Sequence, residues 1–214
     1  MAGAHDLKDI CERAMRKGRS FDLSDCVYGE TNGCCPFINR PTSYYYFLAG
    51  LVHAENLSYI LEAGTHFGGS IMSMSKGLRE GDIPKSMLVT IDITSKNVDG
   101  FKKYPHITRV LGDSLSEGVI SRACRMFDRS IDLLYIDSLH EYEHAKRNLD
   151  VYADPLSARY VILDDIHLTG AMEKFWGELV ERFRERAFDA SVLVKRRSAG
   201  FGVIEWREKE EVLC

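Results

Sequence analysis

The chain has 214 residues, of which 45% are hydrophobic and 28% are charged, and its formal net charge is -4. This length fits one domain with a single full core, and the composition excludes a disordered or fibrous chain. The slightly acidic balance gives no electrostatic reason to expect a nucleic-acid partner.

The apolar runs of the sequence are too short to span a bilayer, and the first ten residues, MAGAHDLKDI, lack the apolar core of a signal peptide. We therefore expect a cytoplasmic protein without a membrane partner. The six cysteines, at positions 11, 26, 34, 35, 124 and 214, form no C-x-x-C pair. In a cytosolic chain we expect them to be free thiols, and the adjacent Cys34 and Cys35 could not bridge without strain.

The first 57 residues are expected to form an N-terminal helical lid on the domain of residues 58–214, and not a separate domain. A helix is expected around Asp6–Arg16, followed by a loop rich in Gly, Asn, Asp and Pro up to Pro41. Thr42 or Ser43 can cap a second helix with an apolar stripe. The three tyrosines of that helix, at positions 44 to 46, are expected to pack inside, although one ring could line a substrate pocket.

From residue 58 onward, short apolar runs alternate with helix-period segments. The expected strands are Tyr59–Ala63, Met87–Ile93, Ile107–Leu111, Ile131–Asp137, Tyr160–Asp165, Ser191–Val194 and Gly202–Trp206. Such alternation predicts a parallel sheet covered by helices on both faces. The last two strands are joined by KRRSAG, which is too short for a helical crossover, so they should pair antiparallel as a hairpin.

The helix before this hairpin is expected to bury one apolar stripe. Its members are Leu168, Met172, Phe175, Trp176, Leu179, Val180 and Phe183.

Polar residues follow the ends of the five expected parallel strands, where ligands bind in open α/β sheets. The first strand runs into EAGTHFGGS, whose glycines Gly64 and Gly68 allow backbone to approach a ligand closely. The helix that follows offers free N–H groups to an anion. Asp92 ends the second strand and is placed to accept hydrogen bonds from a ribose diol. Asp113 and Ser114 end the third strand and can hydrogen-bond an adenine.

The carboxylate of Glu62 argues against a pyrophosphate at the first turn, because like charges repel. It favours a cationic or amino-bearing ligand instead. S-adenosylmethionine is a cofactor that combines an adenosine, a positive charge and an amino acid, and it matches these strand ends.

From about Ser58 to Trp206, the chain resembles the class I S-adenosylmethionine-dependent methyltransferases. It is most similar to the small O-methyltransferases of the catechol and caffeoyl-CoA type and their bacterial relatives. EAGTHFGGS follows the pattern E-x-G-x-x-x-G-x-S, and IDLLYIDSLHEYEHAKRNLDVY followed by YVILDDI resembles the signatures of strands four and five. The glycine pair usual before strand five is replaced by LSARY. The resemblance implies a doubly wound, Rossmann-like seven-stranded α/β sheet of order 3-2-1-4-5-7-6 with an antiparallel C-terminal strand.

The resemblance also implies roles for individual residues. The residues that would hold the methionine portion of the cofactor are Glu62, Gly64, Thr65, Gly68 and Ser70. Asp92 would bind the ribose, and Asp113 with Ser114 would bind the adenine. Asp137 would also lie beside the cofactor.

In metal-dependent members, acids ending strands four and five bind one divalent cation. The corresponding residues here are Asp137, Asp164 and Asp165, and oxygen ligands of this kind select Mg²⁺. Adjacent acids on a strand point to opposite faces, so Asp164 and Asp165 can share a metal only if the strand has ended. His167 could replace one ligand.

The sequence thus predicts methyl transfer to an oxygen of a small molecule. Asp137 and its partners would hold the acceptor oxygen. His140 stands where such enzymes carry a lysine, and it would remove the proton. The alternatives are a nicotinamide-dependent oxidoreductase, which needs a pyrophosphate cradle, and a non-catalytic cofactor-binding subunit. A homodimer through the N-terminal helices or the edge hairpin is also expected to be feasible.

Several residues keep a plain structural alternative. Glu62 could cap the following helix, and Asp164 with Asp165 could form the N-cap of the long helix. Asp92 and Asp113 could be ordinary loop acids. His140 could simply hydrogen-bond backbone. His66 and His144 are expected at the surface.

Overall fold

The structure is a computed structural model that describes residues 6–29 and 40–207. Cys34, Cys35 and Cys214 lie outside the described residues. The helices are α1 Leu7–Gly18, α2 Ser43–Glu55, α3 Gly69–Gly77, α4 Val98–Phe101, α5 Glu117–Cys124, α6 Tyr142–Asn148 and α7 Gly170–Phe183. The strands are β1 Tyr59–Ala63, β2 Met87–Asp92, β3 Ile107–Leu111, β4 Leu133–Ile136, β5 Tyr160–Asp164, β6 Ala187–Asp189 and β7 Phe201–Glu205.

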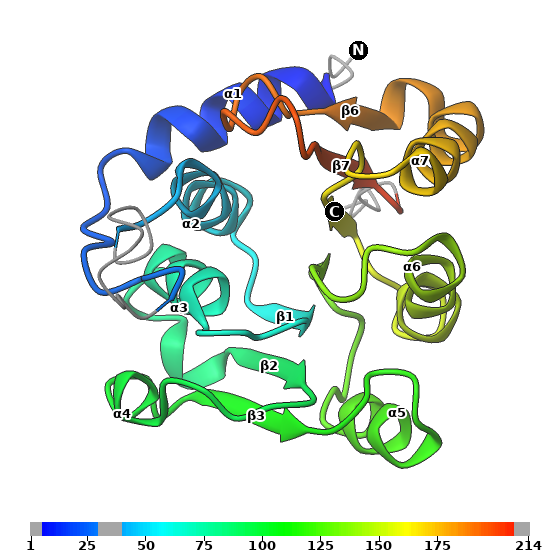
Figure 1. Ribbon diagram of the computed structural model, residues 1–214. Coiled ribbons are helices and arrows are strands. Elements are labelled where there is room, and N and C mark those ends of the chain that lie inside the picture. The colour runs from blue at the N-terminus through cyan, green and yellow to red at the C-terminus, as the bar shows by residue number, and fades with distance from the viewer. Residues whose placement is uncertain (1–5, 30–39, 208–214) are drawn as a thin grey trace, which may run out of the picture.

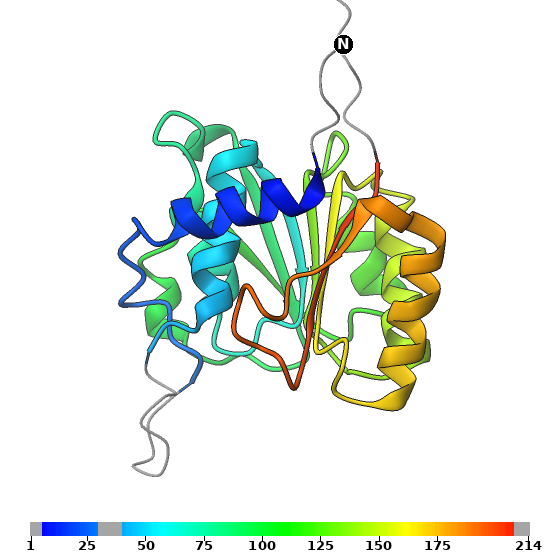
Figure 2. The same ribbon diagram turned by 90° about the horizontal axis from the view of Figure 1, so that it is seen from above.

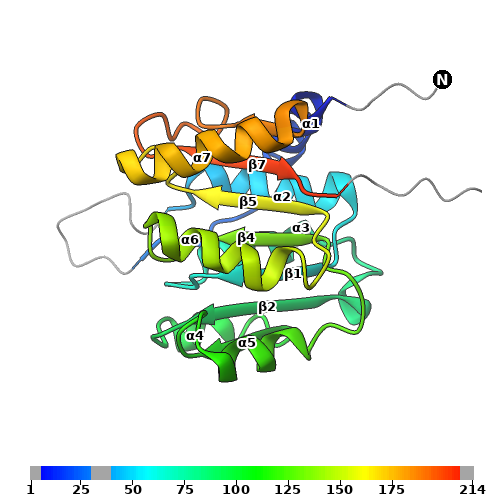
Figure 3. The same ribbon diagram turned by 90° about the vertical axis from the view of Figure 1, so that its right-hand side faces the viewer.

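The seven strands form one sheet of order β3-β2-β1-β4-β5-β7-β6, which confirms the predicted topology (Figure 3). The strands β1 to β5 run parallel, and β7 pairs antiparallel with both β5 and β6. The carboxyl ends of the five parallel strands therefore meet at one edge of the sheet. The amino end of β7 lies at that same edge, because β7 runs in the opposite direction.

The hairpin is confirmed, but its first strand was predicted at the wrong residues. The strand β6 is Ala187–Asp189, and Ser191–Val194 forms turns instead. The Asp189 carboxylate accepts hydrogen bonds from the backbone N–H and the hydroxyl of Ser191. This local bonding competes with the strand ladder and ends β6.

Two separate cores lie on the two faces of the sheet, because neighbouring residues of a strand point to opposite sides. Ile60 and Leu88 pack with the apolar side chains of α1, α2 and α3. The next residues along those strands, Leu61 and Val89, pack with α5, α6 and α7. Figures 1 and 2 show these three layers, with the strands between the two groups of helices.

The helices α1 and α2 belong to the layer that covers the sheet. Of α2, Tyr44, Phe47 and Leu48 are almost fully buried in the same core as the strands. The two helices pack closely through glycines: a β-carbon on Gly18 would lie 1.7 Å from the Tyr46 carbonyl oxygen. Of the described N-terminal residues, the two helices therefore contribute side chains to the core.

The stripe of the long helix is confirmed for its central members and wrong for two. Met172, Phe175, Trp176, Leu179 and Phe183 are buried, whereas Leu168 is 51% exposed and Val180 is 40% exposed. Leu168 precedes the helix, whose N-cap is Thr169, and the Thr169 hydroxyl accepts a hydrogen bond from the Met172 N–H. Asp164 and Asp165 are therefore not the cap of α7. Within the described parts of the chain, no helix has the length and apolar character that a bilayer crossing requires.

Candidate functional site

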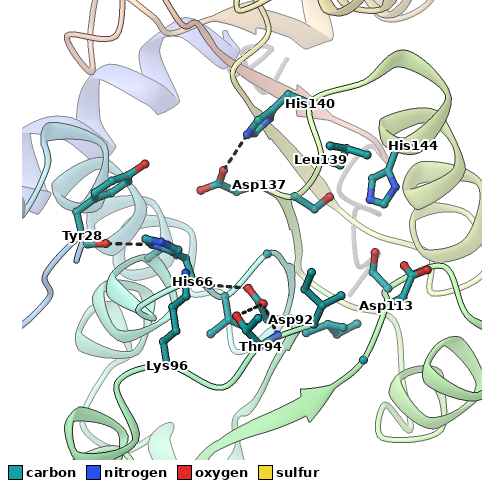
Figure 4. A pocket seen from close by; sticks show the side chains of 18 of the residues that line it. Tyr28, His66, Asp92, Thr94, Lys96, Asp113, Asp137, Leu139, His140 and His144 are labelled. Atoms are coloured by element: carbon teal, nitrogen blue, oxygen red, sulfur yellow. Dashed lines mark hydrogen bonds and ion pairs between the residues drawn. The ribbon is translucent and has the colours of Figure 1, made fainter. Parts of the chain in front are cut away.

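A cavity of about 660 Å³ opens at the carboxyl ends of the parallel strands (Figure 4). This volume lies within the range of small-molecule and cofactor sites. Eight residues predicted from the sequence line it together: Gly64, Thr65, Ser70, Asp92, Asp113, Ser114, Asp137 and His140. The predicted crevice at the strand ends therefore exists, and most of its predicted members face one space.

The floor of the cavity is held by the close approach of β1 and β4. Gly64 has a φ of +104°, and a β-carbon there would lie 1.7 Å from the Asp137 carbonyl oxygen. The backbone N–H of Asp137 donates to the Ala63 carbonyl at 2.8 Å. A glycine is required at position 64 both for the backbone angle and for the contact.

Glu62 lies beneath the cavity and does not line it. The residue is still inside the paired part of β1, opposite Thr90 of β2, and its side chain is fully buried. It accepts hydrogen bonds from the hydroxyls of Ser70 and Thr90. The Thr90 hydroxyl also contacts the Thr65 hydroxyl at 2.5 Å. The position of Glu62 thus corrects the prediction of direct ligand contact: the carboxyl group positions Ser70 and Thr65, which do face the cavity.

Burial raises the pKa of Glu62 from 4.5 to about 8, although its hydrogen bonds with Ser70 and Thr90 act in the opposite direction. A carboxyl group removed from water resists ionisation. At neutral pH, Glu62 is therefore mainly a neutral acid that links two hydroxyls, and not a free carboxylate available to a cationic ligand.

Gly68 also lies outside the cavity lining, which corrects its predicted contact with the ligand. Its φ is +80°, and it forms the N-cap of α3. A β-carbon on Gly68 would lie 2.3 Å from the ring of Phe101. This glycine is needed for the turn and for packing against Phe101 of α4.

The Asp92 carboxylate is fixed at the end of β2. It accepts hydrogen bonds from the backbone N–H of His66 at 2.8 Å, and from the backbone and side chain of Thr94 at 2.7 and 2.9 Å. Burial acts to raise the pKa of Asp92, but these hydrogen bonds outweigh it and hold the pKa below the usual range. An ionised and oriented carboxylate at this place can accept hydrogen bonds from a diol.

His66 and His144 line the cavity. His66 is exposed, as predicted, whereas His144, also predicted at the surface, is half-buried. The His66 ring donates through Nδ1 to the Tyr28 carbonyl at 3.1 Å, which ties the N-terminal segment to the rim. His144 lies on the same side as Asp113 (Figure 4). Burial lowers the pKa of His144, so its ring is neutral at pH 7. His144 lies in α6, which begins shortly after the carboxyl end of β4, and this position along the chain could have indicated that His144 lies near the cavity.

Asp137 and His140 form the polar end of the cavity. His140 Nε2 lies 3.7 Å from Asp137 Oδ1 and 3.1 Å from Asp165 Oδ2. The Tyr135 hydroxyl donates to Asp137 Oδ2 at 3.1 Å. Burial raises the pKa of Asp137, which the nearby His140 partly opposes. An imidazole between two carboxyl groups is well placed to accept a proton, because the imidazolium that forms is stabilised by both.

The predicted metal ligands are not assembled around an open cation site. The strand β5 ends at Asp164, and Asp165 has a φ of +56°. The two adjacent acids therefore need not point to opposite faces of the sheet, as they would inside a strand. Both carboxylates, however, pair with one guanidinium: Arg196 Nε lies 3.1 Å from Asp164 Oδ1, and its Nη2 contacts Asp165 Oδ1. Across the described residues, no group of three or more His, Cys, Asp or Glu side chains is arranged to hold a metal ion.

His167 does not join Asp137 either. Its Nε2 lies 2.8 Å from Asp189 Oδ2, away from the cavity lining.

Further lining residues were not given a role from the sequence. They are Tyr28, Ile91, Ile93, Thr94, Lys96, Gly112, Ser138 and Leu139. Tyr44 and Tyr45 also line the cavity, in agreement with the prediction that a ring of the tyrosine run could do so. Ile93, Ser138 and Leu139 each follow a strand-end acid, and that position was a usable signal. Tyr28 lies in a loop far along the chain from the strands, and no local pattern points to its place.

The comparisons with known proteins agree with this geometry. Residues 61–166 match a family model described as a methyltransferase domain. An uncharacterised protein of Sinorhizobium fredii, y4gI, is 26% identical over 148 residues, which cover 60% of this chain. The match covers 16% of that relative's length, so the relative is a much longer protein.

Solved structures of methyltransferases share the fold. A Podospora anserina methyltransferase with bound S-adenosylhomocysteine has a TM-score of 0.58 at 16% identity, covering 96% of this chain and 91% of that one. A Bacillus cereus O-methyltransferase, also with S-adenosylhomocysteine, has a TM-score of 0.55 at 17% identity, covering 92% and 90%. The methyltransferase MycE of mycinamycin biosynthesis, in complex with Mg and S-adenosylhomocysteine, has a TM-score of 0.54 at 14% identity, covering 88% and 55%.

The family model and these solved structures are all of methyltransferases, and none favours the nicotinamide-dependent oxidoreductase. The strand order, the cavity at the strand ends and the matched family model agree with one another. Residues 61–166 thus match a methyltransferase domain, and the chain has the fold of S-adenosylmethionine-dependent O-methyltransferases.

Proposed function

We propose that this protein transfers the methyl group of S-adenosylmethionine to a hydroxyl oxygen of a small-molecule acceptor. One observation carries the proposal: the acid suited to a ribose, Asp92, and the proton-accepting pair Asp137 and His140 face the same cavity. The reaction needs a methyl donor and an acceptor hydroxyl side by side, in a space that excludes water.

The cofactor would occupy the side of the cavity formed by the ends of β1, β2 and β3. Thr65 and Ser70 would bind the amino-acid portion, Asp92 the ribose, and Asp113 with Ser114 the adenine. Asp92 supports this orientation of the cofactor, because hydrogen bonds from the backbone N–H groups of His66 and Thr94 hold its carboxylate in one position.

The acceptor would lie next to His140, between the strand ends and the N-terminal segment. In the transfer, the acceptor oxygen forms a bond to the methyl carbon while the carbon–sulfur bond breaks, and S-adenosylhomocysteine leaves. The hydroxyl proton passes to His140 Nε2, between Asp137 and Asp165. The aromatic rings of Tyr28 and Tyr45 in the cavity wall support an acceptor with an apolar ring.

Calorimetric titration with S-adenosylhomocysteine tests the cofactor assignment. Binding with micromolar affinity is expected, and reduced nicotinamide nucleotide should give no heat of binding. The absence of S-adenosylhomocysteine binding would overturn the proposal. A second assay follows formation of S-adenosylhomocysteine from S-adenosylmethionine over a panel of catechols, other phenols and sugar hydroxyls. Cofactor binding without turnover over the whole panel would favour the non-catalytic alternative.

Three finer predictions from the sequence belong to this proposal. They are the division into a lid of residues 1–57 and a domain of residues 58–214, a homodimer and a cytoplasmic location. The predicted assistance by Mg²⁺ at Asp137, Asp164 and Asp165 does not belong to it, because Arg196 already pairs with Asp164 and Asp165. The Mg complex described above concerns MycE. In this chain, Arg196 pairs with Asp164 and Asp165, and it would compete with a metal ion for their carboxylates.

A further inference from the structure

A single guanidinium neutralises the two acids that end β5. Arg196 comes from the loop of residues 190–200 between β6 and β7. Its Nε lies 3.1 Å from Asp164 Oδ1, and its Nη2 pairs with Asp165 Oδ1. The Asp164 side chain is 2% exposed, that of Asp165 13% and that of Arg196 21%. The ion pairs therefore lie largely out of contact with water, where an unpaired carboxylate would be costly.

The loop that carries Arg196 is fastened to the end of β5 by backbone hydrogen bonds. The N–H groups of Asp165 and His167 donate to the carbonyls of Gly200 at 3.2 Å and Ala199 at 2.7 Å. Inside the loop, the Arg196 N–H donates to the Ser191 carbonyl at 2.8 Å. These hydrogen bonds fix the backbone of the loop, and the backbone in turn holds the Arg196 side chain near Asp164 and Asp165.

One further contact and the local backbone hold the guanidinium in place. It lies 4.9 Å from the ring centre of Tyr44, a fully buried residue of α2. On either side of the ion pair, Asp165 and Lys195 have φ values of +56° and +61°. A backbone in the left-handed region is costly for both residue types and persists where the surrounding structure imposes it.

The guanidinium and a divalent cation would compete for the same carboxylate oxygens. Asp165 Oδ1 is taken by Arg196, and Asp165 Oδ2 lies 3.1 Å from His140 Nε2. A divalent ion bound to Asp164 and Asp165 would lie within a few ångströms of a permanent positive charge in a poorly solvated place, and the repulsion would be large. The residues present therefore do not fit the predicted metal while Arg196 is in this position.

We propose that Arg196 replaces the divalent cation in this protein. It fixes Asp165, and through Asp165 it holds His140 toward the cavity, so Arg196 is a positioning residue. The assignment of His140 as proton acceptor rests on the proposed function, whereas the competition between Arg196 and a metal ion does not.

Binding of Mn²⁺, followed by the loss of the free-ion signal in electron paramagnetic resonance, tests this inference. The wild-type protein is expected to bind Mn²⁺ at this site only weakly. Arg196→Ala removes the cation paired with Asp164 and Asp165, and it should tighten Mn²⁺ binding on the order of tenfold or more. Arg196→Lys keeps a positive charge and should resemble wild type. Arg197→Ala removes the exposed neighbouring arginine and should change nothing.

Tight stoichiometric binding of Mn²⁺ to the wild type, lost in Asp164→Asn, would overturn the inference without any arginine variant. A folded Arg196→Ala protein with unchanged Mn²⁺ affinity would overturn it as well. If Arg196→Ala does not fold, the wild type and Arg196→Lys decide the question. Titration of each protein with S-adenosylhomocysteine separates the two proposals, because loss of cofactor binding counts against the methyltransferase function and leaves the Mn²⁺ result intact.

Discussion

The α-carbon of Gly64 lies directly against the carbonyl oxygen of Asp137, so closely that a β-carbon on Gly64 would be 1.7 Å from that oxygen. Gly64 follows β1 and Asp137 follows β4, the two central strands of the sheet. This contact brings the cofactor side and the proton-accepting side of the cavity together. A side chain at position 64 would force the two strand ends apart.

Gly64→Ala is therefore expected to lower the free energy of unfolding by more than about 2 kcal/mol, because it combines a backbone clash with a disfavoured φ. Cofactor binding should be lost at the same time. Urea denaturation and calorimetry measure the two effects. Gly177→Ala is the matched control: Gly177 lies in α7, the added carbon would face open space beyond the helix's own backbone, and a gain of about 0.5–1 kcal/mol is expected. Equal stability of the two variants would contradict the role given to Gly64.

His140→Ala is expected to reduce kcat by about 10²–10⁴-fold, because proton removal in the transfer step would lose its acceptor. The affinity for S-adenosylhomocysteine should stay within about threefold of wild type, since such a change is below 1 kcal/mol. Steady-state kinetics and calorimetry give both quantities. His106→Ala serves as control, because His106 precedes β3 at the amino end of the strands and hydrogen-bonds Ser75. Undiminished turnover in His140→Ala would exclude the proposed role.

Asp92→Ala is expected to weaken binding of S-adenosylhomocysteine by about 10–100-fold, corresponding to about 1.5–3 kcal/mol for hydrogen bonds to a charged group. The loop around Thr94 also loses its acceptor. Isothermal titration calorimetry measures the loss. Asp99→Ala removes an acid whose side chain is 91% exposed and paired with Lys102, and it should bind like wild type. If both variants bind equally well, Asp92 does not contact the ribose.

Glu62 should make the protein less stable as the pH rises. Burial holds its folded-state pKa at about 8, above the ordinary value of 4.5. The folded protein thus keeps a proton that the unfolded chain releases between these values. The stabilisation is complete below about pH 4.5 and is lost as the pH rises through about 8, with an upper limit of about 5 kcal/mol.

Urea denaturation between pH 5 and pH 9 measures this dependence. Glu62→Gln keeps the shape of the side chain and cannot ionise, so it should flatten the curve over this interval. Glu117→Gln, on the exposed surface of α5, should keep the wild-type slope. A Glu62→Gln protein with the wild-type slope would show that Glu62 is not the group responsible.

The parallel strands could be located in the sequence because each is a short apolar run with a polar end, whereas their order was implied by the resemblance to methyltransferases. The five parallel strands lie where they were predicted, with small differences at their ends. The clearest error was Ser191–Val194, which shares no residue with β6: the bonding of Ser191 to Asp189 ends that strand before the predicted segment begins. Apolar patterns report burial, and turn residues 191–194 are partly buried too.

The sequence alone determined which acids gather at one edge, since parallel strands place their carboxyl ends together whatever covers the sheet. Only the tertiary structure decided which of these acids face the cavity and which are already paired. Glu62 is covered because β2 and α3 close over it, and Asp164 and Asp165 are neutralised by Arg196 from a loop 31 residues away. Packing between segments far apart in the sequence sets the direction and the partner of a side chain. The spacing of residues along the chain therefore predicts neither.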